Sequence, residues 1–202
     1  MDAIAIDIEP TRAAAVPVVW TLPDRGTVGM MSFIIAESAI FTIFVVAYLF
    51  YVGKSLTGPT PRDVLEVPIF YTICLLSSSV TIHVAGRRLA RNETNAFLVF
   101  WLVTIALGAT FMFGTAQEWR RLIYEDGLTI STNLFGTTYY SLVGLHAFHV
   151  TVGLVMLTLV AWLSVAADIR RHARRVEVLS LYWHFVDVVW VVVFTVVYVI
   201  GR

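Results

Sequence analysis

Five long apolar runs alternate with shorter polar connections along this chain of 202 residues. The runs cover residues 28–52, 67–85, 96–116, 138–166 and 179–200. An α-helix needs about 20 predominantly apolar residues to cross a lipid bilayer, and every run comes close to that length. The connections contain no soluble domain, no internal repeat and no low-complexity stretch. The pattern therefore predicts an all-α fold, a polytopic membrane helix bundle with five transmembrane helices.

The composition supports a membrane protein and narrows its class. Hydrophobic residues make up 58% of the chain, its mean hydropathy is +0.81, and charged residues make up only 14%. An ordinary soluble domain carries roughly 25% charged residues, so a soluble protein of this size would not bury this apolar content. Basic and acidic residues balance at 14 each, and this balance gives no indication of a nucleic-acid partner.

Residues 1–27 differ from the rest of the chain, because they carry acidic residues and are interrupted by three prolines. A secretory signal needs a basic start and an unbroken apolar run, and neither is present. We interpret this segment as a retained, mostly irregular N-terminal tail that precedes the membrane domain, residues 28–202.

The distribution of lysine and arginine predicts how the bundle is oriented. One side of the membrane receives Arg12, Arg25, Arg87, Arg88, Arg91, Arg170, Arg171, Arg174 and Arg175. The other side receives the smaller set Lys54, Arg62, Arg120, Arg121 and Arg202. Basic residues are enriched in cytoplasmic segments, so we expect a cytoplasmic N-terminus and a C-terminus outside.

Ionisable side chains inside the apolar runs are costly and are therefore the candidates for function. Away from the ends of the runs they are Glu37, His146, His149, His184 and Asp187, whereas His83 lies near the predicted cytoplasmic end of the second run. With a helical rise of 1.5 Å per residue, Glu37 and Asp187 fall ~14 Å and ~12 Å from the predicted cytoplasmic end. The two histidines of the fourth run are three residues apart, as are His184 and Asp187, so each pair shares a helix face. We expect one polar layer if these helices face one another.

Three interpretations of this layer remain open from the residues alone. Histidines on two facing helices can ligate a haem. A carboxylate-bridged metal site is a second possibility, although such sites use four carboxylates and Glu-x-x-His pairs, which this chain lacks. The third is a hydrogen-bonded layer that fixes helix packing, with its carboxyl groups neutral or paired. The residues favour the third interpretation, so we predict no metal site and no catalytic residue, and we assign no role to His83.

Two other groups of polar residues have simpler interpretations. Basic residues beside the spans are topology signals that also contact anionic lipid headgroups, and the candidates are Arg87, Arg88, Arg174 and Arg175. The serines at 77–79 and Thr81, inside the second run, are expected to bond to their own helix or to a neighbour. Glu118 is expected at the outer end of the third helix, too far away to join the polar layer.

Several motifs resemble one family closely. The segment from Tyr182 to Trp190, Tyr-Trp-His-Phe-Val-Asp-Val-Val-Trp, resembles the last-helix motif of subunit III of haem–copper cytochrome c oxidases. The segment Gly144-Leu-His-Ala-Phe-His-Val-Thr-Val-Gly153 is similar to the Gly-x-His-x-x-His-Val-x-x-Gly motif of the preceding helix in that family. The resemblance covers residues 28 to the end.

Further positions add to the resemblance. Gln117, Glu118 and Trp119 match the end of a family helix, and Asp126-Gly127 followed by Thr138 resembles the family's lead into the next helix. Glu37 occupies the place of the family's membrane glutamate, with Ala36 where serine usually precedes it. Larger members have seven helices, and this chain resembles the short bacterial type that lacks the first two.

The resemblance implies a function for the chain within a larger complex. It implies subunit III of a bacterial aa3-type cytochrome c oxidase in the inner (plasma) membrane, with no redox cofactor of its own. Such a subunit packs on catalytic subunit I, binds phospholipid, stabilises the complex that also contains subunit II, and supports proton uptake. Haem and copper belong to the partner subunits, and cytochrome c meets only the complex. A quinol oxidase subunit III and an accessory subunit of nitric oxide reductase remain alternatives, as does a haem-binding membrane protein of a different class.

Overall fold

The computed structural model describes residues 24–166 and 173–201, and in these residues it is all-helical. The long helices are α1 (Arg25–Tyr51), α3 (Ile69–Ala90), α4 (Thr94–Tyr124), α5 (Leu134–Ala166) and α6 (Ala173–Phe194), and α6 continues into the π-helical segment η2 (Thr195–Ile200). Five helices are long and apolar enough to cross a membrane, the last being α6 together with η2. The fold class predicted from the sequence is therefore confirmed.

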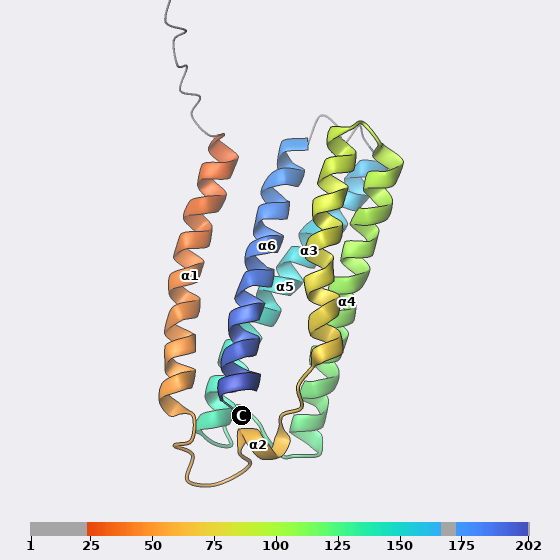
Figure 1. Ribbon diagram of the computed structural model, residues 1–202. Coiled ribbons are helices and arrows are strands. Elements are labelled where there is room, and N and C mark those ends of the chain that lie inside the picture. Colours follow the sequence, from red (N-terminus) through yellow and green to blue (C-terminus); the bar gives the residue numbers. More distant parts are fainter. Residues whose placement is uncertain (1–23, 167–172, 202) are drawn as a thin grey trace, which may run out of the picture.

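The helices form an antiparallel bundle with α1 on one flank (Figure 1). Helix α1 packs against α5 and α6, and α3 packs against α4 and α6. The start of α1 and the α3–α4 connection lie at one end of the bundle, while α2 and the C-terminus lie at the other. This arrangement agrees with alternating spans, but which end faces the cytoplasm stays a prediction.

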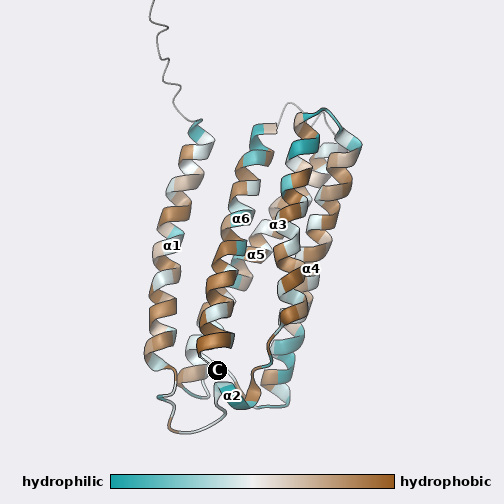
Figure 2. Cartoon of the chain, viewed as in Figure 1, coloured by the Kyte–Doolittle hydropathy of each residue, from teal (hydrophilic) through white to brown (hydrophobic). Residues whose placement is uncertain are grey.

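The helices extend beyond the apolar runs from which they were predicted. Helix α4 continues eight residues past the predicted boundary to Tyr124, so Glu118 does not end it, contrary to expectation. Helix α6 begins at Ala173, within the predicted fourth connection. Hydropathy identifies only the part of a helix that lies in the hydrocarbon core of the bilayer. The helical hydrogen bonds of the backbone continue beyond it where polar side chains are solvated or paired. Figure 2 shows these polar ends in teal.

The predicted N-terminal tail is only partly testable, because residues 1–23 lie outside the described residues. Residues 25–27 already belong to α1. The helix begins here because the Asp24 carboxylate accepts a hydrogen bond of 3.1 Å from the backbone N–H of Gly26, which caps the helix N-terminus. Four residues used in the orientation argument also lie outside the described residues: Arg12, Arg170, Arg171 and Arg202.

A short helix, α2 (Pro61–Val64), lies in the first connection and was not predicted. Thr60 and Asp63 form a capping box, in which the Asp63 carboxylate accepts from the backbone N–H and the hydroxyl of Thr60. These hydrogen bonds, the side-chain one first, hold the pKa of Asp63 below its usual value. The helix is a single turn, too short for a hydropathy pattern to reveal.

Trp183 of α6 is the centre of the helix packing. A Cβ placed on Gly108 of α4 or on Gly153 of α5 would lie 2.9 Å or 2.8 Å from its indole ring. The indole N–H donates a 2.8 Å hydrogen bond to the hydroxyl of Ser78 on α3. The absence of side chains at the two glycines therefore lets one buried tryptophan contact three neighbouring helices.

Candidate functional site

Glu37 and His149 form a pair that joins α1 to α5. Glu37 Oε2 lies 3.2 Å from His149 Nε2, and the other ring nitrogen lies 2.8 Å from the carbonyl oxygen of Leu145. A carbonyl oxygen only accepts, so Nδ1 carries a proton and donates it. The Nε2–Oε2 contact then holds one proton, as imidazolium with carboxylate or as imidazole with carboxylic acid. Both arrangements are neutral overall, which suits an apolar environment.

Asp187 and His184 of α6 meet Ser79 of α3. The Ser79 hydroxyl donates to Asp187 Oδ2 and lies 3.0 Å from His184 Nδ1. Because its proton points to the carboxylate, the hydroxyl accepts from Nδ1–H of the imidazole. His184 and Asp187 thus lie on one face of α6, as predicted. Of the serines expected to bond to their own helix or to a neighbour, Ser78 bonds to both and Ser79 bonds to α6.

His146 belongs to neither cluster. Its side chain is fully buried, its ring stacks on Trp190 at a centroid distance of 5.0 Å, and the edge of Phe111 lies on another side. Neither ring nitrogen has a hydrogen-bond partner among the described residues. The five residues therefore do not form the single polar layer expected from helical depth. Glu37 pairs with His149, His184 and Asp187 meet Ser79, and the imidazole of His146 stands apart.

The distances between these ionisable side chains can be compared with what a metal site requires. Within residues 24–166 and 173–201, no three His, Cys, Asp or Glu side chains lie close enough together to hold a metal ion. His149 uses both ring nitrogens within the protein, and aromatic rings cover His146. His149 is thus engaged in contacts between helices, whereas the absence of a haem or metal stays a prediction.

The predicted outer motif connects α4 to three other elements. Gln117 Oε1 accepts a 2.9 Å hydrogen bond from Tyr71 of α3, and both carboxylate oxygens of Glu118 lie 2.9 Å from the hydroxyl of Tyr198 in η2. Trp119 packs edge-on against Tyr140 of α5 at 5.4 Å. Consecutive helical residues point about 100° apart, so three neighbours in sequence reach three different elements.

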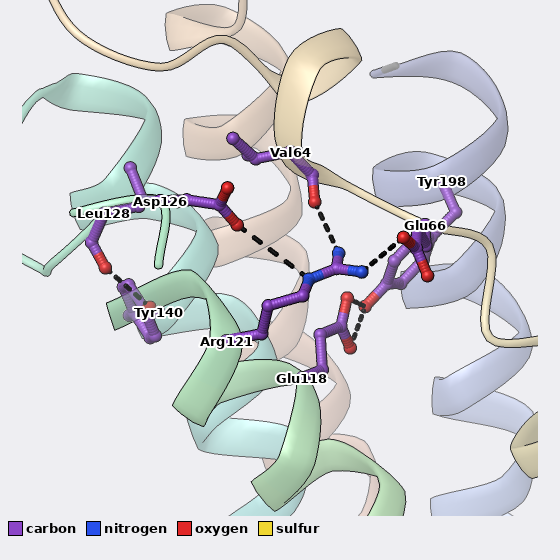
Figure 3. A network of polar contacts seen from close by, with 8 residues as sticks. All are labelled: Val64, Glu66, Glu118, Arg121, Asp126, Leu128, Tyr140 and Tyr198. Atoms are coloured by element: carbon purple, nitrogen blue, oxygen red, sulfur yellow. Dashed lines mark hydrogen bonds and ion pairs between the residues drawn. The ribbon is translucent and has the colours of Figure 1, made fainter. Parts of the chain in front are cut away.

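Arg121 organises the same end of the bundle, a role that its place in the sequence does not reveal (Figure 3). Its guanidinium donates to the carbonyl oxygen of Val64 at 2.8 Å, pairs with Glu66 and lies 3.9 Å from Asp126. It therefore holds two connections against α4. Asp126 belongs to the Asp-Gly pair that resembles a family motif, and no signal in the sequence pairs it with Arg121.

The four candidate lipid-contacting arginines have different surroundings. Arg88 forms an ion pair of 2.6 Å with Glu93, and Arg174 lies 3.5 Å from Asp24 at the start of α1. Arg87 and Arg175 are exposed, and no ion pair is present for either among the described residues. All four lie at the same end of the bundle, where lipid contact remains an expectation.

Two grooves open beside the polar pairings. The first, of about 530 Å³, lies between α1 and α5 and is lined by apolar side chains together with Glu37 and His149. The second, of about 450 Å³, lies between α3 and α6 and is lined by His83, Arg87, Ser180 and His184 among others. Both grooves are thus mostly apolar, and the second includes more polar side chains than the first.

Comparison with known proteins agrees with the motifs. The family described as cytochrome c oxidase subunit III matches residues 24–202. The chain is 41% identical to cytochrome c oxidase subunit 3 of Synechocystis sp. over 187 residues, covering 88% of this chain and 77% of the relative. It is 31% identical to cytochrome c oxidase subunit 3 of Thermostichus vulcanus, covering 89% and 90%. It is also 34% identical to the cytochrome bo(3) ubiquinol oxidase subunit 3 of Pseudomonas aeruginosa, covering 86% and 84%. The chain therefore belongs to the cytochrome c oxidase subunit III family, whose members are subunits of haem–copper oxidase complexes.

Proposed function

We propose that this chain is subunit III of a bacterial aa3-type cytochrome c oxidase. The observation that supports the proposal most strongly is the family match over residues 24–202 together with the similarity to proteins named cytochrome c oxidase subunit 3. In this role the chain lies in the inner membrane with a cytoplasmic N-terminus, packs on catalytic subunit I and forms part of the complex that contains subunit II.

The proposed role is supporting and not catalytic. Haem and copper belong to the partner subunits, where electrons from cytochrome c reduce oxygen, and this chain binds phospholipid, stabilises the complex and supports proton uptake. The pairings of the intramembrane groups support this role, because Glu37 and Asp187 are both engaged within the bundle. Arg87 and Arg175 are the better candidates for lipid headgroups, since Arg88 and Arg174 have acidic partners within the chain.

A quinol oxidase subunit III is the second candidate. Relatives with this name include the Pseudomonas aeruginosa protein above and quinol oxidase subunit 3 of Bacillus subtilis, which is 30% identical. Other subunits of such complexes bind the electron donor, so the described residues of this chain do not distinguish the two donors.

The decisive experiment is purification of the affinity-tagged full chain from its native membranes with whatever subunits it retains. We expect two larger subunits, the optical spectrum of haem A, copper, and oxygen consumption supported by reduced cytochrome c. Oxygen consumption with quinol alone would replace the cytochrome c assignment by the second candidate. Recovery of the chain alone with stoichiometric haem would overturn the supporting role.

A further inference from the structure

The groove between α3 and α6 carries its two charged side chains near one end. Arg87 of α3 and Glu177 of α6 line it from opposite walls. Arg87 lies three residues before the end of α3 and Glu177 four residues after the start of α6, so they are ~5 Å and ~6 Å from those ends. Both side chains are exposed, and neither forms an ion pair or a side-chain hydrogen bond with any described residue. A cation and an anion thus lie at a similar level without neutralising each other.

The next level inward carries a hydrogen-bond donor. His83 lies seven residues before the end of α3 and Ser180 seven residues after the start of α6, so both are ~10 Å from those ends. His83 is exposed and makes no side-chain hydrogen bond with any described residue, which leaves an imidazole N–H able to donate. The Ser180 hydroxyl already donates to the Val176 carbonyl oxygen at 2.8 Å, so it can only accept.

The remaining lining of the groove is apolar apart from His184. Ile82 and Leu181 lie at its inner part, where His184 Nδ1 is already 3.0 Å from the Ser79 hydroxyl. A Cβ built on Gly86 would meet nothing within 4 Å, so the groove stays open between its levels. Its volume of about 450 Å³ is in the range of small-molecule sites.

This order of polarity matches the order of groups along a phospholipid. A phospholipid carries a charged headgroup, then ester carbonyl oxygens that only accept hydrogen bonds, then hydrocarbon. The polar interface of a bilayer is about 5–8 Å thick on each side, which is comparable to the depth of Arg87 and Glu177. The phosphate accepts from Arg87, an ester carbonyl accepts from His83, and an acyl chain covers the apolar inner part. A transmembrane protein helix has no fixed sequence of this kind, so the groove fits lipid better.

Glu177 decides which headgroup fits. An anionic headgroup such as phosphatidylglycerol brings its negative charge to Arg87 but leaves Glu177 facing a like charge. A primary ammonium donates charge-assisted hydrogen bonds to a carboxylate, so an ethanolamine headgroup satisfies both walls at once. The quaternary ammonium of phosphatidylcholine has no N–H to donate. The pair of charges therefore favours an aminophospholipid.

The groove between α1 and α5 provides an internal comparison. Its charged groups are Glu37 and His149, which contact each other at 3.2 Å. Glu37 lies twelve residues after the start of α1, at ~18 Å, well below the depth of a headgroup. No lysine or arginine lines this groove. Hydrocarbon can cover it, but it offers no site for a phosphate.

We propose that the α3–α6 groove binds one aminophospholipid, of which phosphatidylethanolamine is the common form. The ammonium group binds Glu177, the phosphate binds Arg87, an ester carbonyl accepts from His83, and one acyl chain lies along Ile82 and Leu181. This inference rests on the proposed function for phospholipid binding and deepens it, because it names the headgroup and the place.

The test uses the complex that contains the tagged full chain, reconstituted in bilayers with equal amounts of phosphatidylethanolamine, phosphatidylcholine and phosphatidylglycerol. In three parallel preparations, one of the lipids carries a photoreactive diazirine in its acyl chain, and mass spectrometry locates the adducts. Phosphatidylethanolamine should label the peptides around Ile82 and Leu181 at least about tenfold more than the other two lipids. This ratio corresponds to about 1.4 kcal/mol, close to the contribution of one hydrogen bond between charged groups. The exposed face of α5 around Val155 and Leu159 is the reference, where the three lipids should label equally.

Substitutions test the two charges separately. Glu177→Gln should lower phosphatidylethanolamine labelling of the groove to the level of phosphatidylcholine, and Glu177→Lys should make phosphatidylglycerol the preferred lipid. Arg87→Gln should lower phosphatidylethanolamine labelling as well, because it removes the partner of the phosphate. Arg175→Gln and Glu125→Gln are the matched controls, since both residues are exposed and lie outside the groove, and these variants should keep the preference.

Three outcomes would overturn the proposal. Equal labelling of the groove by the three lipids would mean ordinary bilayer lipid, and a preference of the unaltered chain for phosphatidylglycerol would exclude the ammonium contact. Labelling of the α5 face without any labelling of the groove would mean that something other than lipid, such as a protein helix, occupies it. Each of these results leaves the proposed function standing when oxidase subunits copurify with the chain. Absence of those subunits would overturn the proposed function, whereas the lipid preference is read from the same spectra independently.

Discussion

Glu37 of α1 and His149 of α5 share one proton across a distance of 3.2 Å, because the second ring nitrogen of His149 donates to the Leu145 carbonyl oxygen. The pair is the only hydrogen-bond or ion-pair contact between α1 and α5 among the described residues. An unpaired carboxyl or imidazole group would be costly in the bilayer, and the contact between the two groups lowers that free-energy cost.

Removing the carboxyl group should therefore weaken the attachment of α1. Glu37→Ala leaves His149 Nε2 without a partner, and we expect a loss of about 1–3 kcal/mol in stability. In the assembled oxidase, the substitution should reduce the number of turnovers completed before inactivation more than it reduces the initial rate of oxygen reduction. Ser38→Ala is the control, since Ser38 bonds only to its own helix. Complete loss of oxygen reduction in a fully assembled Glu37→Ala complex would contradict a supporting role.

Glu37 should also be chemically accessible from the lipid phase. Its side chain is 18% exposed and lines the α1–α5 groove. A hydrophobic carbodiimide, which reacts with protonated carboxyl groups, should label Glu37, whereas Asp187 is only 3% exposed and should remain unlabelled. Mass spectrometry of the digested chain locates the adduct. Glu37→Gln should abolish it, and persistent labelling of that variant at Asp187 would show that the two sites were assigned wrongly.

Ser79 should contribute more to stability than its neighbour Ser77. Ser79→Ala removes the hydroxyl that Asp187 and His184 share, and Asp187 Oδ1 already lacks a partner. We expect a loss of about 1–3 kcal/mol, measured as a lower midpoint of thermal unfolding in detergent. Ser77 has no side-chain hydrogen bond among the described residues, so Ser77→Ala should change the midpoint little. Equal effects of the two substitutions would argue against the α3–α6 pairing.

Arg121 should hold the end of the bundle opposite the start of α1. Arg121→Lys keeps the charge but cannot reach Val64, Glu66 and Asp126 at once, because an ammonium lacks the planar, forked geometry of a guanidinium. Limited proteolysis should then cut faster in the connections at 53–66 and 125–133. Arg120→Lys is the matched control, since Arg120 is exposed and forms no ion pair among the described residues. Unchanged cleavage in the Arg121 variant would show that other contacts hold these connections.

The packing around Trp183 should not tolerate a methyl group. Gly153→Ala places a Cβ 2.8 Å from the indole ring, and overpacking of this kind costs about 1–3 kcal/mol. Gly29→Ala, on α1 with nothing within 4 Å, should be neutral or stabilising by up to about 1 kcal/mol, because alanine favours helix. Thermal unfolding of the two variants distinguishes them. A neutral Gly153→Ala would mean that α5 and α6 can separate at this point.

The sequence alone determined the membrane class, the five spans and the ionisable residues inside them. Apolar runs of bilayer length have few alternatives to a spanning helix, because every backbone polar group must be hydrogen-bonded within the segment. The motifs around His149 and Asp187 also indicated the family, which the comparisons then showed.

Only the tertiary structure decided which of these residues meet. Helix α1 is apolar almost all round, so no stripe in its sequence reveals which side faces the bundle, and Glu37 could equally have turned toward α6. Depth along the helix predicted one layer, whereas rotation about each helix axis placed His149 with Glu37 and Asp187 with Ser79. That rotation is set by side-chain packing between helices, such as Trp183 against Gly108 and Gly153, and such packing depends on residues distant in the sequence.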